Sequence, residues 1–251
     1  MGKDIEVDTI SQNRQMDPPL LSEAVENYLK AIYQIGSAGQ GASAQEIAAQ
    51  VGVSAPGVSK MLRHLAKHNL IRYEPYQPVL LTETGEKIAL EVIRHHRLIE
   101  LYLTQSMGYG WDKVHSEAER LEHHISEEFE DTIERLLGYP EFDPHGDPIP
   151  TRDGKVAPPV TDTLEEQAAG VHVVVRRVTD ENDELLRYLA ARNIRPGTLI
   201  ELLDREPFGG SLLVRLAAGE QRISPDAARH VFVEVVPGSS ASGKADKASE
   251  R

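Results

Sequence analysis

The chain has 251 residues, of which 40% are hydrophobic and 27% charged, which is enough to build packed domains and excludes global disorder. Its net charge of −13 excludes a uniformly basic protein that coats nucleic acid, but leaves room for a locally basic surface. Cysteine is absent, which excludes disulfide scaffolds, thiolate zinc sites, iron–sulfur clusters and cysteine nucleophiles.

Residues 1–19 and 237–251 are polar, and their composition predicts a disordered head and a disordered tail. The first of these segments lacks the apolar core of a signal peptide. No apolar run elsewhere approaches the length of a transmembrane helix. We therefore expect a cytoplasmic protein without a membrane partner.

Residues 20–84 predict a winged helix-turn-helix domain that binds DNA. Apolar residues recur at helical spacing at its start. Ser43 and Glu46 then fit a capping box at the start of a short second helix, which Gly52 ends. A third helix follows, with Pro56 in its first turn. Two short β-like runs around a proline-containing turn complete the pattern of a wing.

The third helix of this domain is the predicted DNA reader. Its first turn carries small polar residues suited to base edges, and its exposed flank carries basic residues suited to phosphates. Between Val51 and Tyr73 every residue with a formal charge is basic. An ordinary helical hairpin with a solvated basic face is the alternative. The expected DNA-contacting residues are Ser54, Pro56, Ser59, Lys60 and Arg63.

Residues 85–138 predict a helical domain that binds metal and forms a dimer. Two residues four positions apart share one face of its first helix, and four more form a continuous stripe on the next. If these helices faced one another, imidazoles and carboxylates would come within reach of one divalent cation. Ligation by N and O without sulfur favours Mn²⁺, Fe²⁺ or Zn²⁺; solvated surface side chains are the alternative. The two stripes are His96 and Glu100, then His115, Glu119, Glu122 and His123.

Other polar residues of this region are left out of the predicted metal site. His95 and His124 fall off the stripes, and His145 lies in residues 139–163, a segment rich in proline and glycine that we expect to be a linker. Four acidic residues are interpreted as surface charge: Glu117, Glu127, Glu128 and Glu130. The apolar face of residues 126–138 packs either against a second subunit or against the chain's own helices: Phe129, Ile133, Leu136 and Leu137.

The patterns of metal enzymes and of phosphate loops are missing. The chain has no His-Glu dipeptide of a zincin, no Glu-x-x-His pair of a di-iron bundle and no glycine-rich nucleotide loop. We therefore expect no enzyme. A metal-binding helical enzyme or carrier without a DNA role stays open as an alternative.

Residues 164–236 change from helical to strand periodicity. Five strand-like runs are separated by turn signals, with one helix-like stretch after the first run. This pattern predicts an SH3-like β-barrel. The expected fold class is therefore mainly α with a small β module.

Five segments of residues 20–236, taken in order, resemble the diphtheria toxin repressor family: LSEAVENYLKAIY, the Ser54–Lys60 helix, HHRLIELYL, VHSEAERLEHHIS and GDPIP. These are metal-dependent bacterial transcription repressors, with the manganese transport regulators as one branch. The resemblance implies a homodimer that binds a palindromic operator in double-stranded DNA when loaded with Mn²⁺ or Fe²⁺. It would control genes of metal uptake and homeostasis.

The resemblance also implies two metal sites. The primary site would join the second stripe to the first helix: Glu119, Glu122, His123 and Asn27. The ancillary site would join both stripes and, in some members, the C-terminal domain: His96, Glu100, His115, Asp180 and Asp183.

Three positions depart from the iron-type or two-metal pattern. Iron-type members have Cys at the position of Glu119, so the hard oxygen ligand favours Mn²⁺ and the manganese branch. An iron-dependent repressor of iron uptake genes is the alternative, and Zn²⁺, Co²⁺ and Ni²⁺ are expected to bind in vitro. Asn27 offers a neutral carbonyl where other members have Met or Asp. Lys30 falls where a two-metal manganese site uses a carboxylate, which argues against that binuclear geometry.

Overall fold

The computed structural model describes residues 22–36, 41–180 and 182–237. The head predicted over residues 1–19, and residues 238–251 of the predicted tail, lie outside these ranges. Within the described ranges no helix is both long enough and apolar enough to cross a lipid bilayer.

The chain forms two compact units. The first contains residues up to Ile99, together with Ala118–Glu141 and Ile149–Ala157. The second contains Glu100–Glu117, Phe142–Pro148 and the chain from Pro158 onward. Segments that are far apart in the sequence therefore share each core.

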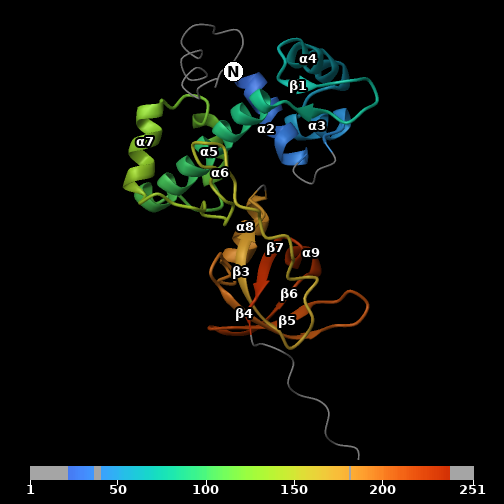
Figure 1. Cartoon of the computed structure of the whole chain (residues 1–251). Helices are drawn as coiled ribbons and strands as arrows, with labels where there is room; N and C mark the ends of the chain where they lie inside the picture. The colour runs from blue at the N-terminus through green and yellow to red at the C-terminus, as the bar shows by residue number, and fades with distance from the viewer. Residues whose placement is uncertain (1–21, 37–40, 181, 238–251) are drawn as a thin grey trace, which may run out of the picture. The chain divides into compact units, whose positions relative to one another are not determined.

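The N-terminal part of the first unit is a helix-turn-helix with a wing (Figure 1). Its helices are α2 (Glu23–Gly36), α3 (Ala44–Val51) and α4 (Ala55–Lys67). The wing is the antiparallel pair β1 (Ile71–Arg72) and β2 (Leu80–Leu81). Apolar side chains from all three helices and the wing form one buried cluster, which includes Leu29, Ile47, Leu62 and Val79.

The predicted signals set the bounds of α3. Ser43 accepts a hydrogen bond from the Glu46 amide at 3.2 Å, and the Glu46 carboxylate accepts one from the Ser43 amide at 2.9 Å. Gly52 ends the helix at φ 70°, a conformation that glycine adopts without strain. The capping box and the glycine stop are therefore confirmed.

The helical region differs from the prediction in one respect. Helix α5 (Glu83–Met107) is continuous, but the expected second helix is divided into α6 (Val114–Leu121) and α7 (Glu127–Leu136). The break has a local cause, because Ser126 caps α7 by accepting a hydrogen bond from the Phe129 amide at 3.3 Å. Glu122 and His123 consequently lie in the turn after α6 rather than on a helix.

Buried ionic contacts hold α7 to α5. Arg94 forms an ion pair with Glu130 and a second with Glu134 at 2.8 Å, and His95 donates to Glu130 at 3.2 Å. Burial alone would raise the pKa of Glu130, but the hydrogen bond from His95 and the charge of Arg94 hold it at about 2. The interpretation of Glu130 as surface charge is therefore wrong.

The apolar face of α7 is divided between the core and the surface. Ile133 is buried in the chain's own core, whereas Phe129 and Leu136 are exposed. Packing against the chain's own helices therefore accounts for only part of this face.

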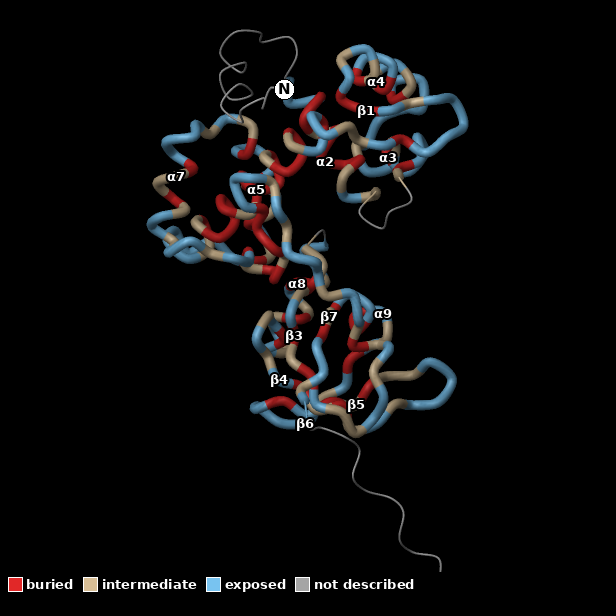
Figure 2. The backbone as a smooth tube through the Cα atoms, in the orientation of Figure 1, coloured by how far each residue is buried: buried red, intermediate tan, exposed pale blue. Residues whose placement is uncertain are grey.

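The second unit is built on a five-stranded antiparallel sheet with the order β6-β5-β4-β3-β7. Its strands are β3 (His172–Val178), β4 (Leu199–Arg205), β5 (Leu212–Leu216), β6 (Gly219–Ile223) and β7 (Val231–Val235). Helices α8 (Asp183–Ala190) and α9 (Pro225–Ala228) complete the module. Figure 2 shows buried positions along β3, β5 and β7, and Val173, Val175 and Val178 belong to this core. Each predicted strand-like run is a strand, and the mainly α fold with a small β module is confirmed.

Candidate metal centres

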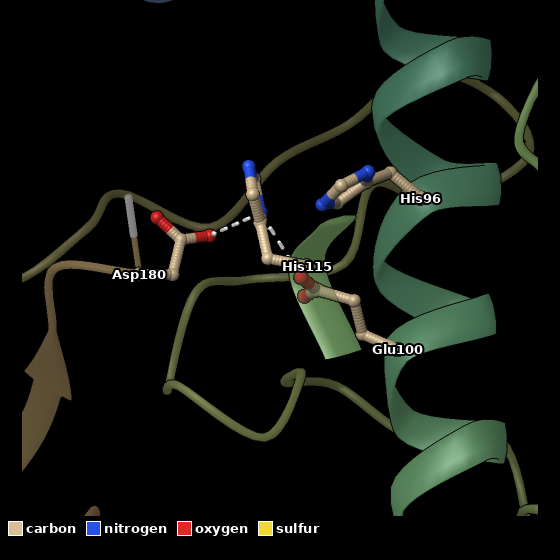
Figure 3. A group of neighbouring side chains, drawn as sticks. All are labelled: His96, Glu100, His115 and Asp180. Carbon is tan, nitrogen blue, oxygen red and sulfur yellow. Dashed lines mark hydrogen bonds and ion pairs between the residues drawn. The ribbon is translucent and has the colours of Figure 1, made fainter. Parts of the chain in front are cut away.

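The first candidate centre lies wholly within the second unit. Glu100 comes from α5, His115 from the first turn of α6 and Asp180 from the segment after β3. Nδ1 of His115 is 3.2 Å from Oε1 of Glu100 and 3.4 Å from Oδ2 of Asp180, so this ring stands between two carboxylates (Figure 3). His96 lies one turn before Glu100 on the same face of α5, as Figure 3 shows.

The segment Phe142–Pro148 adds two more ligand-type side chains to this centre. Asp143 Oδ1 accepts hydrogen bonds from the amides of His145 and Asp147, at 2.8 and 2.9 Å, which forms a tight turn. Gly146 has φ 93° and packs against β3 so closely that an added Cβ would lie 1.9 Å from the Arg176 carbonyl oxygen. The turn therefore needs glycine, and it brings Asp143 and His145 together.

We name the group Glu100, His115, Asp143, His145 and Asp180 the His145 cluster. One ligand atom from each of Glu100, Asp143 and His145 lies within 4.8 Å of the others, and all three residues are buried. The segment that the sequence predicted as part of a linker thus carries a member of a candidate metal centre.

The imidazole of His145 is oriented as a ligand would be. The residue is 0% exposed, and Nε2 donates a hydrogen bond to the Trp111 carbonyl oxygen at 2.8 Å. The Trp111 ring stacks on the imidazole, with 5.6 Å between the ring centroids. Nδ1 is buried without a hydrogen-bond partner, 3.6 Å from Oε2 of Glu100. A ring fixed through one nitrogen, with the other aimed at carboxylates, is typical of a metal-ligating histidine.

The carboxylates of the cluster favour positive charge. Burial alone would lower the pKa of His145, but Glu100, Asp143 and Asp180 outweigh burial and raise it to about 9. The pKa of His115 is raised to about 10, because Asp180 and Glu100 overcome the effect of burial. Without an ion, protons on these rings balance the carboxylates. The residues of the His145 cluster therefore fit a divalent cation, which would replace those protons.

Asp183, the other residue expected from the C-terminal domain, lies elsewhere. It is the first residue of α8, is exposed and faces Arg187 at 4.0 Å. The structure brings Asp180 to the cluster and does not bring Asp183.

The second candidate centre lies within the first unit, and a lysine fills it. Nζ of Lys30, on α2, is 2.9 and 2.8 Å from the two carboxylate oxygens of Glu122 and 2.9 Å from Oε1 of Glu119. Nδ1 of His96 lies 3.4 Å from the same ammonium and 2.5 Å from Oε2 of Glu122. We name Lys30, His96, Glu119 and Glu122 the Lys30 cluster.

The remaining residues expected at this centre contact one another. Nδ1 of His123 lies 2.6 Å from Oε2 of Glu26, and Nε2 lies 3.0 Å from the amide oxygen of Asn27. Both ring nitrogens are therefore directed at side chains of α2. Both α2 residues therefore hold His123, and Glu26 was not identified from the sequence.

Electrostatics keep the ammonium of Lys30 charged. Burial alone would lower the pKa of Lys30, but the charges of Glu122 and Glu119 outweigh burial and raise it. The pKa of Glu122 is lowered in spite of its burial, because His96 and Lys30 stabilise the carboxylate. As it is arranged here, the Lys30 cluster does not fit a metal ion.

The predicted DNA-contacting residues lie on one accessible helix end. Ser54 is the N-cap of α4, and Pro56 lies in the first turn. Ser54, Pro56, Lys60 and Arg63 are exposed and Ser59 is half-buried. Val58, Leu62 and Leu65 face the core. The opposite face of α4 is therefore accessible and basic, as an element that enters a DNA groove requires.

Two family models that describe iron-dependent repressors match this chain. The N-terminal DNA-binding domain of these repressors matches residues 20–79, and their metal-binding and dimerisation domain matches residues 82–151. A third model, the FeoA domain, matches residues 163–235.

Individual relatives extend across these three segments. The iron-dependent repressor IdeR of Mycobacterium tuberculosis is 32% identical over 206 residues, covering 77% of this chain and 89% of that protein. The diphtheria toxin repressor of Corynebacterium diphtheriae is 30% identical, covering 74% and 87%. A solved manganese-dependent transcriptional repressor in complex with manganese has a TM-score of 0.77 and 35% identity, covering 84% of this chain and all of the other.

Proposed function

Because the chain belongs to the diphtheria toxin repressor family, we propose that it is a metal-dependent transcriptional repressor that binds a palindromic operator as a homodimer. It would act in the cytoplasm on genes of metal uptake and homeostasis, and it would catalyse no reaction. The His145 cluster would sense the ion, and α4 would contact the operator.

One observation carries this proposal: Nδ1 of His145 is buried, has no hydrogen bond, and faces the carboxylate of Glu100 on the long helix α5 at 3.6 Å. A polar atom that is buried without a hydrogen bond destabilises a protein. Such an atom therefore calls for an explanation, and a bound ion is one. A divalent ion would replace the imidazole protons and supply ligand bonds at this position. The winged helix alone would not distinguish a metal sensor from other DNA-binding proteins.

The cluster residues come from four separate segments. Glu100 belongs to α5, His115 to α6, His145 to the turn before Pro148 and Asp180 to the segment after β3. In the metal-free protein their carboxylates repel one another unless the imidazoles are protonated. Neutralising this charge would fasten the four segments together. That would stabilise one arrangement of these segments, which we propose is the form of the protein that binds DNA.

The donor set favours Mn²⁺ as the physiological ion. Every candidate ligand in the His145 cluster is a carboxylate or an imidazole, and thiolate is excluded by the absence of cysteine. Fe²⁺ is the alternative, because one of the relatives is an iron-dependent repressor. Zn²⁺, Co²⁺ and Ni²⁺ would bind in vitro.

A second copy of the chain would cover the exposed part of α7. Phe129 and Leu136 are accessible on this helix, and the matching family model describes a dimerisation domain over the same residues. Two copies related by a two-fold axis would present two α4 helices to a palindromic operator.

Fluorescence anisotropy tests the proposal, with labelled DNA from the region upstream of the protein's own gene. Mn²⁺ should tighten binding by about 5–150-fold, which corresponds to the usual range of coupling between sites. His145→Ala should bind this DNA equally with and without Mn²⁺. If the unaltered protein binds this DNA with equal affinity with and without Mn²⁺, it is not a sensor of that ion. No DNA binding in either condition would favour the metal carrier or enzyme.

The same titration compares the two candidate ions. Mn²⁺ and Fe²⁺ are each added under anaerobic conditions, and the concentration that gives half of the DNA-binding response is measured. A response to Fe²⁺ at lower concentrations than to Mn²⁺ would favour the iron-dependent repressor.

A further inference from the structure

The side chains around the Lys30 ammonium are the candidate ligands of a metal ion. His96, Glu119 and Glu122 each offer one ligand atom, and these atoms lie within 4.8 Å of one another. The ammonium of Lys30 is within 3.4 Å of all three side chains. A divalent ion bound by these three side chains would occupy the position of the ammonium, so the two exclude one another.

The contacts of Lys30 use its full hydrogen-bonding capacity. An ammonium has three N–H donors, and three carboxylate oxygens accept from it: both oxygens of Glu122 and Oε1 of Glu119. The distances of 2.8–2.9 Å to the carboxylates are those of charge-assisted hydrogen bonds. Small divalent ions hold oxygen ligands at about 2.0–2.2 Å. The cluster is therefore shaped around a nitrogen cation.

Lys30 also links elements that a metal ion in this place would link. It lies on α2, whose apolar residues form part of the helix-turn-helix core, and it contacts α6 and the turn that follows. Lys30 is 6% exposed and Glu122 is 0% exposed, so water screens the contact little.

We propose that Lys30 is a built-in cation that replaces a metal ion in the Lys30 cluster and ties α2 to the end of α6 without metal. The chain then takes up its divalent ion only at the His145 cluster. This inference rests on the proposed function only in naming the His145 cluster as the site that binds the ion.

The number of Mn²⁺ ions bound per chain tests the inference, measured on the full-length protein by equilibrium dialysis and elemental analysis. The unaltered protein should bind one Mn²⁺ per chain. Lys30→Ala should bind two, because removing the ammonium exposes three ligand-type side chains. Adding Glu122→Gln to Lys30→Ala should return the number to one. Lys87→Ala, which removes an exposed lysine of α5, should leave it at one.

Thermal melting of the metal-free proteins adds a readout that does not depend on metal at the His145 cluster. Lys30→Ala should melt at a lower temperature than the unaltered protein, and Mn²⁺ should raise its melting temperature more than that of Lys87→Ala. Lys30→Leu, which keeps an aliphatic side chain, serves if Lys30→Ala does not fold.

Two Mn²⁺ ions per chain in the unaltered protein, reduced to one by Glu122→Gln, would overturn the inference. That result would mean that Mn²⁺ displaces the Lys30 ammonium from the Lys30 cluster. A single ion that is lost in Glu122→Gln and kept in His145→Ala would also overturn it. If neither the unaltered protein nor Lys30→Ala binds Mn²⁺, the proposed function fails as well. If one ion is bound and His145→Ala loses it, the proposed function survives whatever Lys30→Ala shows.

Discussion

Nδ1 of His145 lies 3.6 Å from Oε2 of Glu100, and both side chains are fully buried. The other ring nitrogen is held by the Trp111 carbonyl oxygen at 2.8 Å. The ring therefore has one nitrogen fixed and one directed at an acid. This relationship is the basis of the proposed metal centre.

His145→Ala should lower the affinity for Mn²⁺ by more than about 100-fold, since loss of residues that only orient metal ligands already costs about 10–100-fold. Isothermal titration calorimetry measures the change. His124→Ala is the matched control, because that imidazole is exposed, and its affinity should equal that of the unaltered protein. Equal affinities for the two variants would exclude His145 as a ligand.

The affinity for Mn²⁺ should rise with pH. The pKa values of His145 and His115 are about 9 and about 10 in the metal-free fold, so both rings are protonated at pH 7. Binding must release those protons, and the affinity should increase by about 10–100-fold per pH unit between pH 6.5 and 8.5.

Calorimetry in two buffers of different ionisation enthalpy counts the released protons. One or two protons per Mn²⁺ at pH 7 is the expected result. No proton release, with an affinity independent of pH, would contradict the assigned ligands.

Gly146→Ala should destabilise the protein because its new Cβ would meet the Arg176 carbonyl oxygen at 1.9 Å. Gly108→Ala is the matched control: Gly108 also has a positive φ, but an added Cβ there meets nothing within 4 Å. The control should cost about 1–2 kcal/mol for the left-handed conformation. Gly146→Ala should cost about 1–3 kcal/mol beyond the control. Denaturant unfolding compares the two, and equal losses would mean that β3 does not restrict this turn.

Lys60→Ala and Arg63→Ala should weaken DNA binding by similar factors on different sequences if both side chains contact phosphates. Each substitution should also reduce the slope of log affinity against log salt concentration by about one. Anisotropy titrations at several salt concentrations measure both quantities. Lys155→Ala, an exposed lysine outside the winged helix, should change neither. If the salt dependence of the two α4 variants is unchanged, neither side chain contacts a DNA phosphate.

The sequence predicts those parts of the centres that follow from local spacing. Glu100 could be identified because it lies one helical turn after His96 on the same face of α5. The capping box at Ser43 and the basic end of α4 follow from neighbouring residues in the same way. The order of helices and then strands gave the fold class.

The remaining parts depend on contacts between distant segments. His145 and Asp143 lie in a segment without periodicity, and their turn is fixed by the packing of Gly146 against β3. A histidine two residues after an aspartate, in a segment rich in proline, was the available signal in the sequence. The side chain of Lys30 meets Glu122 only when α2 and the end of α6 are packed together. Spacing along α2 does not contain that information.

Anomalous scattering from crystals grown with Mn²⁺ tests the central claim most directly, because it locates the ion among named side chains. The account predicts one strong peak per chain, ligated by Glu100, Asp143 and His145, and none at Lys30. A peak among Glu119, Glu122 and His123, or no peak at the His145 cluster, would contradict it.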